Sequence, residues 1–312
     1  MKYYAGLDIG GSTGRIRLKG EDGKDLGEYR CQGASFFASG QERAKVLYAD
    51  LVLSALDDHH LNPQDCAGLC AAASGVDSES LRRRCRQIFV ELGFPENVIR
   101  IYNDCEIFLT ACRPPSMILV AGTGSIVFGM KKGGQICRTG GWGHILSDEG
   151  SGFHIGLDVI QAAGNHLDGR ICDPVFFQHF RQASGIDQLE PLNQFLMDNI
   201  LTKSSIAALS LVAEKAREDG SETGREILCL AAEKLFHLIE DNGKKMKVQK
   251  GDALEILLWG GVLVKNSYVR EQVSRRIREA FPLASIQIPP KEAVQIALDL
   301  AAASEQQNPS FP

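Results

Sequence analysis

The hydrophobic pattern of the first hundred residues changes its period several times, and the changes predict an α/β arrangement. Three short segments with alternating apolar residues are separated by glycines or by Asp22-Gly23, which predicts an antiparallel meander. Apolar residues then recur alternately at helical and at strand spacing. The expected strands cover residues 3–9, 15–19, 24–31, 67–73 and 98–102, and the expected helices cover residues 41–56 and 78–92.

The opening pattern starts again after Pro114-Pro115, which we interpret as a domain boundary. An apolar segment leads into a second glycine-rich turn, and two further short apolar segments follow it. We expect these strands at residues 117–121, 126–130 and 135–139. The second half of the chain therefore repeats the beginning of the first.

The remaining residues are predicted to be mainly helical. Residues 151–245 carry apolar stripes at spacings of three and four, among them Leu228, Ala232, Leu235 and Ile239. We expect a buried strand at 254–259, followed by a helix that has Val269, Val273, Ile277 and Phe281 on one face. A strand near 286–288, a helix over 291–303 and a frayed tail from 306 are expected after it.

A chain of 312 residues exceeds the size at which one hydrophobic core keeps growing, so two domains are expected. We predict an N-terminal domain of residues 1–114, with a C-terminal helix at 291–305 packing back on it, and a second domain of residues 115–290.

Charge and composition argue against several classes of protein. The net charge is −5 with Lys and Arg spread along the chain, so no nucleic-acid partner is expected, and the cluster of Arg82, Arg83, Arg84 and Arg86 is interpreted as a solvated helix face. No secretion signal and no apolar run of membrane-spanning length occurs, which favours a cytoplasmic protein without a membrane partner. The nine cysteines contain no C-x-x-C pair and the histidines are scattered, so neither a disulfide framework nor a structural metal is predicted.

An acidic residue inside the first apolar strand is the first candidate for chemistry. A buried lone carboxylate is costly, so Asp8 requires a cation or several donors, and magnesium carried in by a nucleotide would supply one through bound water. The following Gly10 and Gly11 allow the backbone to approach phosphate oxygens, with Ser12 and Thr13 completing the turn. A plain hairpin with an edge-strand aspartate is the alternative.

The second turn, Gly122-Thr123-Gly124-Ser125, has two glycines and two hydroxyls but no acid of its own. Two unlike phosphate clamps suit a cleft between domains. The turns are not a Walker motif, because no G-x-x-x-x-G-K-[ST] pattern occurs in the chain, and both turns lead into strands instead of helices. The strand context also argues against a G-x-G-x-x-G dinucleotide fingerprint.

The densest segment runs from Gly140 to Gly152, where five glycines bracket a tryptophan, a histidine and two acids. Ser147-Asp148-Glu149 resembles a helix start with Ser147 or Asp148 as its cap, so capping is one alternative for Asp148. Trp142 offers an apolar platform for a ring, and His144 has either a structural or a functional role.

Asp104 follows Asn103 at the expected carboxyl end of a strand, the edge where open α/β sheets place their chemistry. A cap for a helix from Glu106 onward is the alternative.

Four features of the sequence together resemble the BadF/BadG/BcrA/BcrD-type ATPase family, and within it the N-acetylglucosamine kinases. They are the paired hairpins, Asn103-Asp104, the Gly140–152 segment (Gly-Gly-Trp-Gly-His-x-x-x-Asp-Glu-Gly-Ser) and the Leu258-Trp259-Gly260-Gly261-Val262 turn.

This resemblance implies the actin, sugar kinase and heat-shock chaperone fold: an α/β chain of two ribonuclease H-like domains with a nucleotide cleft between them. It implies ATP and Mg²⁺ as cofactors, a small sugar as the partner, and allows a homodimer. Asp8 would hold Mg²⁺ through water and Asp104 would be the catalytic carboxylate. The phosphates would contact Gly10, Gly11, Ser12, Thr13, Gly122, Thr123, Gly124 and Ser125. The adenosine would lie against Gly260 and Gly261. The sugar would contact Ser74, Asp104, Thr123, Gly141, Trp142 and Asp148.

The chain departs from this pattern at one place. Where the kinases present an asparagine to the sugar, it has Ala34-Ser35-Phe36-Phe37, with Ser39 as the nearest polar candidate. A site that has lost a hydroxyl-binding group changes its discrimination strongly, so the acceptor could be N-acetylglucosamine, glucosamine or N-acetylmuramate.

Two other functions compete with a kinase. An ATPase activator of a 2-hydroxyacyl-CoA dehydratase or benzoyl-CoA reductase would need cysteines for an iron–sulfur cluster, and only Cys66 and Cys70 are close in sequence. An actin-like nucleotide sensor would need neither Asp104 nor the Gly140–152 segment.

Overall fold

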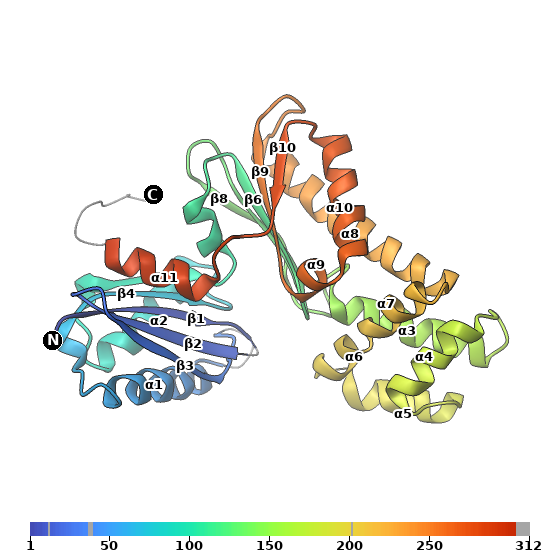
Figure 1. Cartoon of the computed structure of the whole chain (residues 1–312), viewed down its shortest axis with the longest axis horizontal. Helices are drawn as coiled ribbons and strands as arrows, with labels where there is room; N and C mark the ends of the chain where they lie inside the picture. Colours follow the sequence, from blue (N-terminus) through green and yellow to red (C-terminus); the bar gives the residue numbers. More distant parts are fainter. Residues whose placement is uncertain (12, 37–39, 201, 304–312) are drawn as a thin grey trace. The chain divides into compact units, whose positions relative to one another are not determined.

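A computed structural model describes residues 1–11, 13–36, 40–200 and 202–303, which form two compact units. One unit consists of residues 1–112 together with the chain from Pro290 onward, and the other of residues 113–289 (Figure 1). Ser12 and the segment from Phe37 to Ser39 lie outside the described residues, as do Leu201 and the expected tail.

The first unit is a five-stranded mixed sheet covered by helices on both faces. Its strands lie in the order β3-β2-β1-β4-β5, with β1 antiparallel to β2 and parallel to β4. Figure 1 shows α1 below this sheet and α11 above it. The elements are β1 (Tyr3–Ile9), β2 (Thr13–Gly20), β3 (Asp25–Gln32), α1 (Gln41–Asp57), β4 (Cys66–Ala73), α2 (Glu79–Glu91), β5 (Ile99–Asn103), α11 (Ala293–Ala302) and the 3-10 turns Pro63–Asp65, Glu96–Val98 and Glu106–Ala111.

The second unit repeats this topology. Its sheet has the order β10-β9-β6-β7-β8, with β6 antiparallel to β7 and parallel to β9, so the duplication predicted from the two hairpins is present. The strands are β6 (Ser116–Ala121), β7 (Ser125–Met130), β8 (Ile136–Gly140), β9 (Leu254–Trp259) and β10 (Ala284–Gln287). The helices are α3 (Gly152–Leu167), α4 (Pro174–Ser184), α5 (Leu189–Asn199), α6 (Ser204–Ala208), α7 (Ser210–Glu218), α8 (Glu222–Met246), α9 (Gly261–Lys265) and α10 (Ser267–Ala280).

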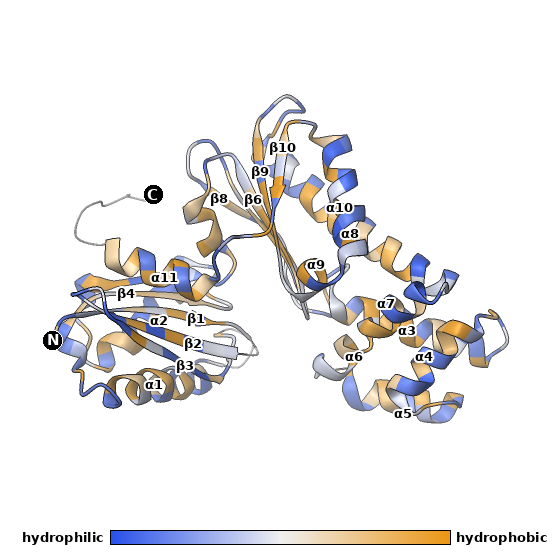
Figure 2. Ribbon diagram, viewed as in Figure 1, coloured by the Kyte–Doolittle hydropathy of each residue, from blue (hydrophilic) through white to orange (hydrophobic). Residues whose placement is uncertain are grey.

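Each unit has its own apolar core. The α8 stripe of Leu228, Ala232, Leu235 and Ile239 is fully buried, as are Val269, Val273 and Ile277 on α10, which confirms both predicted helix faces. Phe281 is also buried, but it follows the last residue of α10. Helices that cover a sheet need one apolar side only, and the ribbons of α1 and α8 alternate between hydrophobic and hydrophilic residues (Figure 2).

Helix α11 packs unusually close to β1 because Gly6 has no side chain. A Cβ added at Gly6 would lie 2.6 Å from Cα of Leu298, a separation that atoms in real proteins do not reach. The glycine therefore allows the helix backbone to rest directly on the strand.

One predicted helix start is wrong. Helix α3 begins at Gly152, not at Ser147 or Asp148, and its N-cap is Ser151, whose hydroxyl accepts a hydrogen bond from the His154 amide. Asp148 instead has a positive φ of 71°, which a helix cap does not require.

Candidate functional site

The first unit collects polar side chains at one edge of its sheet. Strands β1, β4 and β5 are parallel neighbours, so Asp8, Ser74 and Asp104 lie near the same ends of adjacent strands. The Ser74 amide donates to the Ile9 carbonyl at 2.8 Å, and the Ser74 carbonyl accepts from the Phe36 amide at 2.8 Å. Three of the predicted residues are therefore brought together, as expected for chemistry at carboxyl ends of strands.

Asp104 has the most perturbed carboxyl group of this edge. Its pKa is raised from 3.8 to about 7, mainly by burial and also by the negative charges of Asp8 and Asp77, while hydrogen bonds from Ser74 and Cys105 oppose the rise. The side chain keeps partial contact with solvent. A carboxylate with a pKa near neutral is suited to accept a proton at physiological pH.

The neighbouring Asn103, and not Asp104, caps the turn that follows. Oδ1 of Asn103 accepts hydrogen bonds from the amides of Cys105 at 2.8 Å and Glu106 at 3.4 Å, and Nδ2 of Asn103 donates to Asp77 at 2.6 Å. The buried Asn103 thus shapes the turn and leaves the Asp104 carboxylate outside it.

The arginine cluster is only partly a solvated face. Arg83 and Arg84 are exposed, but Arg82 pairs with the buried Glu106 at 2.6 Å and donates to the Ile101 carbonyl. The prediction failed at Arg82 because helical periodicity does not reveal a carboxylate that a distant turn places beside it.

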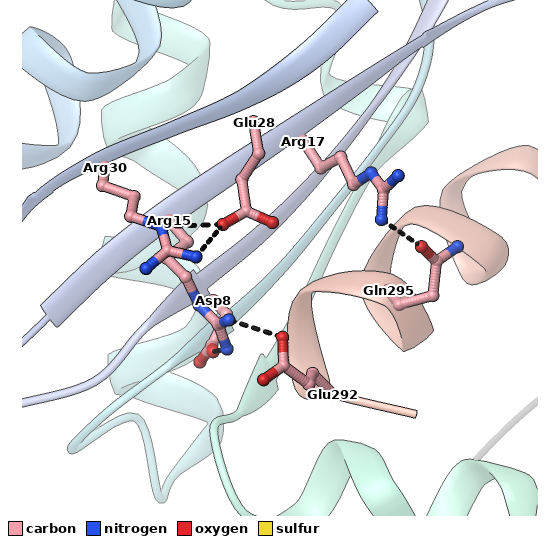
Figure 3. A network of polar contacts seen from close by, with 7 residues as sticks. All are labelled: Asp8, Arg15, Arg17, Glu28, Arg30, Glu292 and Gln295. Atoms are coloured by element: carbon pink, nitrogen blue, oxygen red, sulfur yellow. Dashed lines mark hydrogen bonds and ion pairs between the residues drawn. The ribbon is translucent and has the colours of Figure 1, made fainter. Parts of the chain in front are cut away.

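The cation that Asp8 requires is present within the protein. Arg15 lies directly opposite Asp8 in the β1–β2 register, and its Nη2 donates to Oδ2 of Asp8 at 2.7 Å while its Nη1 donates to Glu292 at 2.6 Å (Figure 3). Burial raises the pKa of Asp8, and the hydrogen bond and charge of Arg15 oppose that rise. The register of the predicted hairpin places Arg15 opposite Asp8, so sequence reasoning could have identified Arg15 as the cation for Asp8.

A magnesium ion still fits this edge. The negative charges of Asp8 and Asp77 raise the pKa of Asp104, so three carboxyl groups lie close enough to interact at this edge. Within the described ranges, no group of three or more His, Cys, Asp or Glu residues could hold a metal by itself. The arrangement suits Mg²⁺, which typically retains several waters and binds through one or two carboxylates plus substrate phosphates.

The first glycine turn is closed by a hydrogen bond from the Gly10 amide to the Thr13 carbonyl at 3.0 Å. A Cβ at Gly11 would meet no atom within 4 Å, so packing within the protein does not require glycine there. Gly11 and Thr13 are exposed, and Ser12 lies outside the described residues.

The fold places an acidic residue, Asp148, beside the second glycine turn. Asp148 accepts a hydrogen bond from the Ser125 backbone amide, and its carboxylate lies so close to Gly124 that a Cβ there would be 2.8 Å from Oδ2. The hydroxyl of the buried Ser125 donates to the Glu149 carbonyl at 2.7 Å. The hydroxyl of Ser125 therefore holds the turn against residues 148–149.

The Gly260 turn lies beside the second glycine turn because β6 and β9 are parallel neighbours. Gly260 has a φ of 92°, and a Cβ there would lie 2.5 Å from the Ala121 carbonyl oxygen. Two motifs far apart in the sequence are thus adjacent, with only 3.8 Å between the Cβ position of Gly122 and the Gly261 nitrogen.

The segment from Gly141 to Asp148 presents Trp142 to solvent, with 68% of that residue exposed. Arg138 stacks its guanidinium 4.0 Å from the centre of the Trp142 ring and donates to the Gly141 carbonyl at 2.6 Å. One face of the predicted platform is therefore covered by a cation. His144 donates from Nε2 to the Ile200 carbonyl at 2.9 Å and packs edge-on against Phe153, which is a structural role.

Comparison with known proteins identifies the family. Residues 5–298 match the BadF/BadG/BcrA/BcrD ATPase family. The chain belongs to this family. Curated relatives of this ATPase family member include an N-acetylmuramic acid/N-acetylglucosamine kinase from Clostridium acetobutylicum, 28% identical over 92% of this chain and 94% of the relative. An N-acetyl-D-glucosamine kinase from Dictyostelium discoideum is 24% identical over 91% of this chain and 93% of its own.

Solved structures agree on the fold of this BadF-type chain. A candidate N-acetylglucosamine kinase from Chromobacterium violaceum superposes with a TM-score of 0.74, at 23% identity over 96% of this chain and 99% of the other. A ROK family glucokinase from Streptomyces griseus gives a TM-score of 0.52 at 15% identity, over 96% and 98% of the two chains. The expected actin-like sugar kinase fold is confirmed. No helix among the described residues meets the length and apolarity that a membrane crossing demands.

Proposed function

We propose that this chain is an ATP-dependent kinase that transfers the γ-phosphate to a hydroxyl of an amino sugar. The observation that carries the proposal is the Asp104 carboxyl, which has a pKa of about 7 and lies at the edge shared with Asp8 and Ser74. Kinase relatives that align along nearly the whole chain support it. ATP is the proposed phosphate donor, and the cytoplasm is the proposed location of the enzyme.

In the first unit, Asp104 would accept the proton of the attacking hydroxyl. Phosphoryl transfer has a loose transition state, so the base acts late and positioning dominates. Asn103 fixes the turn that orients Asp104, and Ser74 would bind the sugar beside it. Asp8 would hold Mg²⁺ through water, and the ion would neutralise negative charge on the phosphates. Backbone amides of Gly11, Ser12 and Thr13 would contact phosphate oxygens, while the Gly10 amide closes the turn through the Thr13 carbonyl.

The second unit would supply the remaining contacts. Amides of Thr123 and Gly124 would bind phosphate, while the Gly122 amide closes the turn through the Gly124 carbonyl and the Ser125 hydroxyl supports the turn through Glu149. Gly260 and Gly261 would lie against the adenosine. Contacts to the sugar are assigned to Thr123, Gly141, Trp142 and Asp148.

A metal-cluster ATPase is less well supported by the cysteines. Cys66 is almost fully buried in β4, and Cys70 is fully buried in the same strand, so these thiols do not form an accessible cluster site. Burial also raises the pKa of both thiols to about 12, which disfavours the thiolate that binds iron.

The test is phosphorylation of a panel of amino sugars, with the sugar phosphate measured by mass spectrometry. N-acetylglucosamine, glucosamine and N-acetylmuramic acid are the first acceptors. Asp104→Asn should abolish transfer and retain ATP binding, whereas Asp25→Asn, a surface carboxylate on the same sheet, should retain both. ATP hydrolysis that is independent of every sugar and unaffected by Asp104→Asn would overturn the proposal.

A further inference from the structure

A lysine stands beside the segment that we assign to the sugar. Nζ of Lys203 lies 3.8 Å from Oδ2 of Asp148, at the start of α6. The hydrogen bond from His144 to the Ile200 carbonyl ties the chain just before Lys203 to the same segment. The ion pair of Lys203 with Asp148 and the hydrogen bond of His144 to the nearby backbone therefore hold the lysine next to Asp148.

The backbone of Lys203 has a φ of 62° and a ψ of −47°, a conformation that residues with a side chain rarely adopt. Such strain persists only where the surrounding structure determines it, and it is concentrated at functional positions. The location of Lys203 is thus imposed by the fold and not by local preference.

The pair with Asp148 leaves the ammonium group with donors to spare. Lysine has three N–H donors, and 3.8 Å exceeds a hydrogen-bond distance. The Lys203 side chain is 36% exposed, and among the described residues Asp148 is the only acid within 4 Å of its ammonium. The Ser125 amide holds the Asp148 carboxylate independently, so Lys203 can bind a second anion while Asp148 keeps its support.

The same segment exposes large apolar side chains. Trp142, Ile145 and Leu146 are 68%, 65% and 81% exposed, respectively. An acceptor with both a carboxylate and an apolar group attached to the sugar ring would find complementary chemistry here, whereas a plain amino sugar has no anion for Lys203. A lactyl ether, with its methyl and carboxylate, is such a substituent.

We propose that Lys203 is a specificity-determining residue that selects amino sugars bearing a carboxylate, the class to which N-acetylmuramic acid belongs. The inference rests on the proposed kinase function and names the acceptor class of the same site. Lys203 binds the substituent carboxylate, and Asp148 remains available for sugar hydroxyls.

The experiment removes the charge from the enzyme and from the substrate in turn. The ratio of kcat/KM for N-acetylmuramic acid to kcat/KM for its neutral lactyl amide is measured in the natural protein and in Lys203→Met. A hydrogen-bonded charge pair predicts a ratio of about 10 or more in the natural protein. Lys203→Met should bring this ratio to about 1, and Lys203→Arg should restore it in part.

Lys234→Met is the matched control, because Lys234 forms a similar pair in the same unit, 3.7 Å from Asp158 with 30% of its side chain exposed. It should leave the ratio unchanged. A lysine that only supports Asp148 would change kcat/KM for acid and amide equally, which overturns the inference, as does a ratio near 1 in the natural protein. Phosphorylation of N-acetylglucosamine alone would overturn the inference but keep the kinase, whereas no phosphorylation of any sugar would overturn both.

Discussion

Replacing Asp104 with asparagine should have opposite effects on activity and on stability. Asp104→Asn keeps the shape of the side chain but removes the carboxylate that accepts the proton. General-base catalysis contributes about 100- to 10,000-fold, so we expect kcat to fall by at least about 100-fold.

The stability effect follows from the difference in the pKa of Asp104 between the folded and unfolded states. Folding raises this pKa from 3.8 to about 7. Between these values the unfolded chain releases the proton while the folded protein retains it, so the natural protein loses stability as the pH rises, and the loss is complete above about pH 7. At about 1.4 kcal/mol per pH unit the interval corresponds to about 4 kcal/mol. Solvent screens the partly exposed carboxyl, and we therefore expect about 1–3 kcal/mol.

Urea unfolding of the natural protein and of Asp104→Asn at pH 4 and pH 8 measures this effect. The variant should match the natural protein at pH 4 and be more stable by about 1–3 kcal/mol at pH 8. A stability difference that is the same at both pH values would refute the assignment of a raised pKa. Asp77→Asn provides an independent check: because it removes a charge that raises the pKa of Asp104, the acidic limb of kcat/KM should move to lower pH.

Three further predictions concern residues around this edge and the sugar segment. Gly6→Ala should destabilise the protein by about 1–3 kcal/mol in thermal unfolding because α11 cannot move aside, whereas Gly11→Ala, where a Cβ meets no atom, should leave stability unchanged and weaken ATP binding. Arg15→Met should cost about 3–5 kcal/mol at pH 7 because it leaves the Asp8 carboxylate without its cation, and an unchanged urea midpoint would contradict this. Trp142→Ala should raise KM for the sugar with little change in melting temperature, since the ring is 68% exposed; a lowered melting temperature would assign the ring to packing.

The strands and the long helices were predictable because their signal is local. Alternation and helical spacing in the sequence match strands such as Tyr3–Ile9 and the buried stripe of α8. The start of α3 was missed because Ser147 and Ser151 are both good caps, and tertiary contacts of the second glycine turn decide between them.

The polar partners at the site were harder to predict, because they depend on contacts between distant segments. Arg15 follows from hairpin register alone, but its second partner Glu292 is 277 residues away, and Lys203 reaches Asp148 from the position just before α6. The charges that raise the pKa of Asp104 come from β1 and from the turn after β4, and no linear motif records that proximity.

The position of α11 affects the order in which the protein can fold during synthesis. The ribosome makes the strands of the first unit, then all of residues 113–289, and only then the helix that covers β1 and β4. Until that helix leaves the exit tunnel, one apolar face of the first sheet lacks its cover, while the second unit already has every element it needs. The later-made unit can therefore complete its core first, and until then the uncovered face of the first sheet is apolar surface of the kind that makes folding intermediates prone to aggregate.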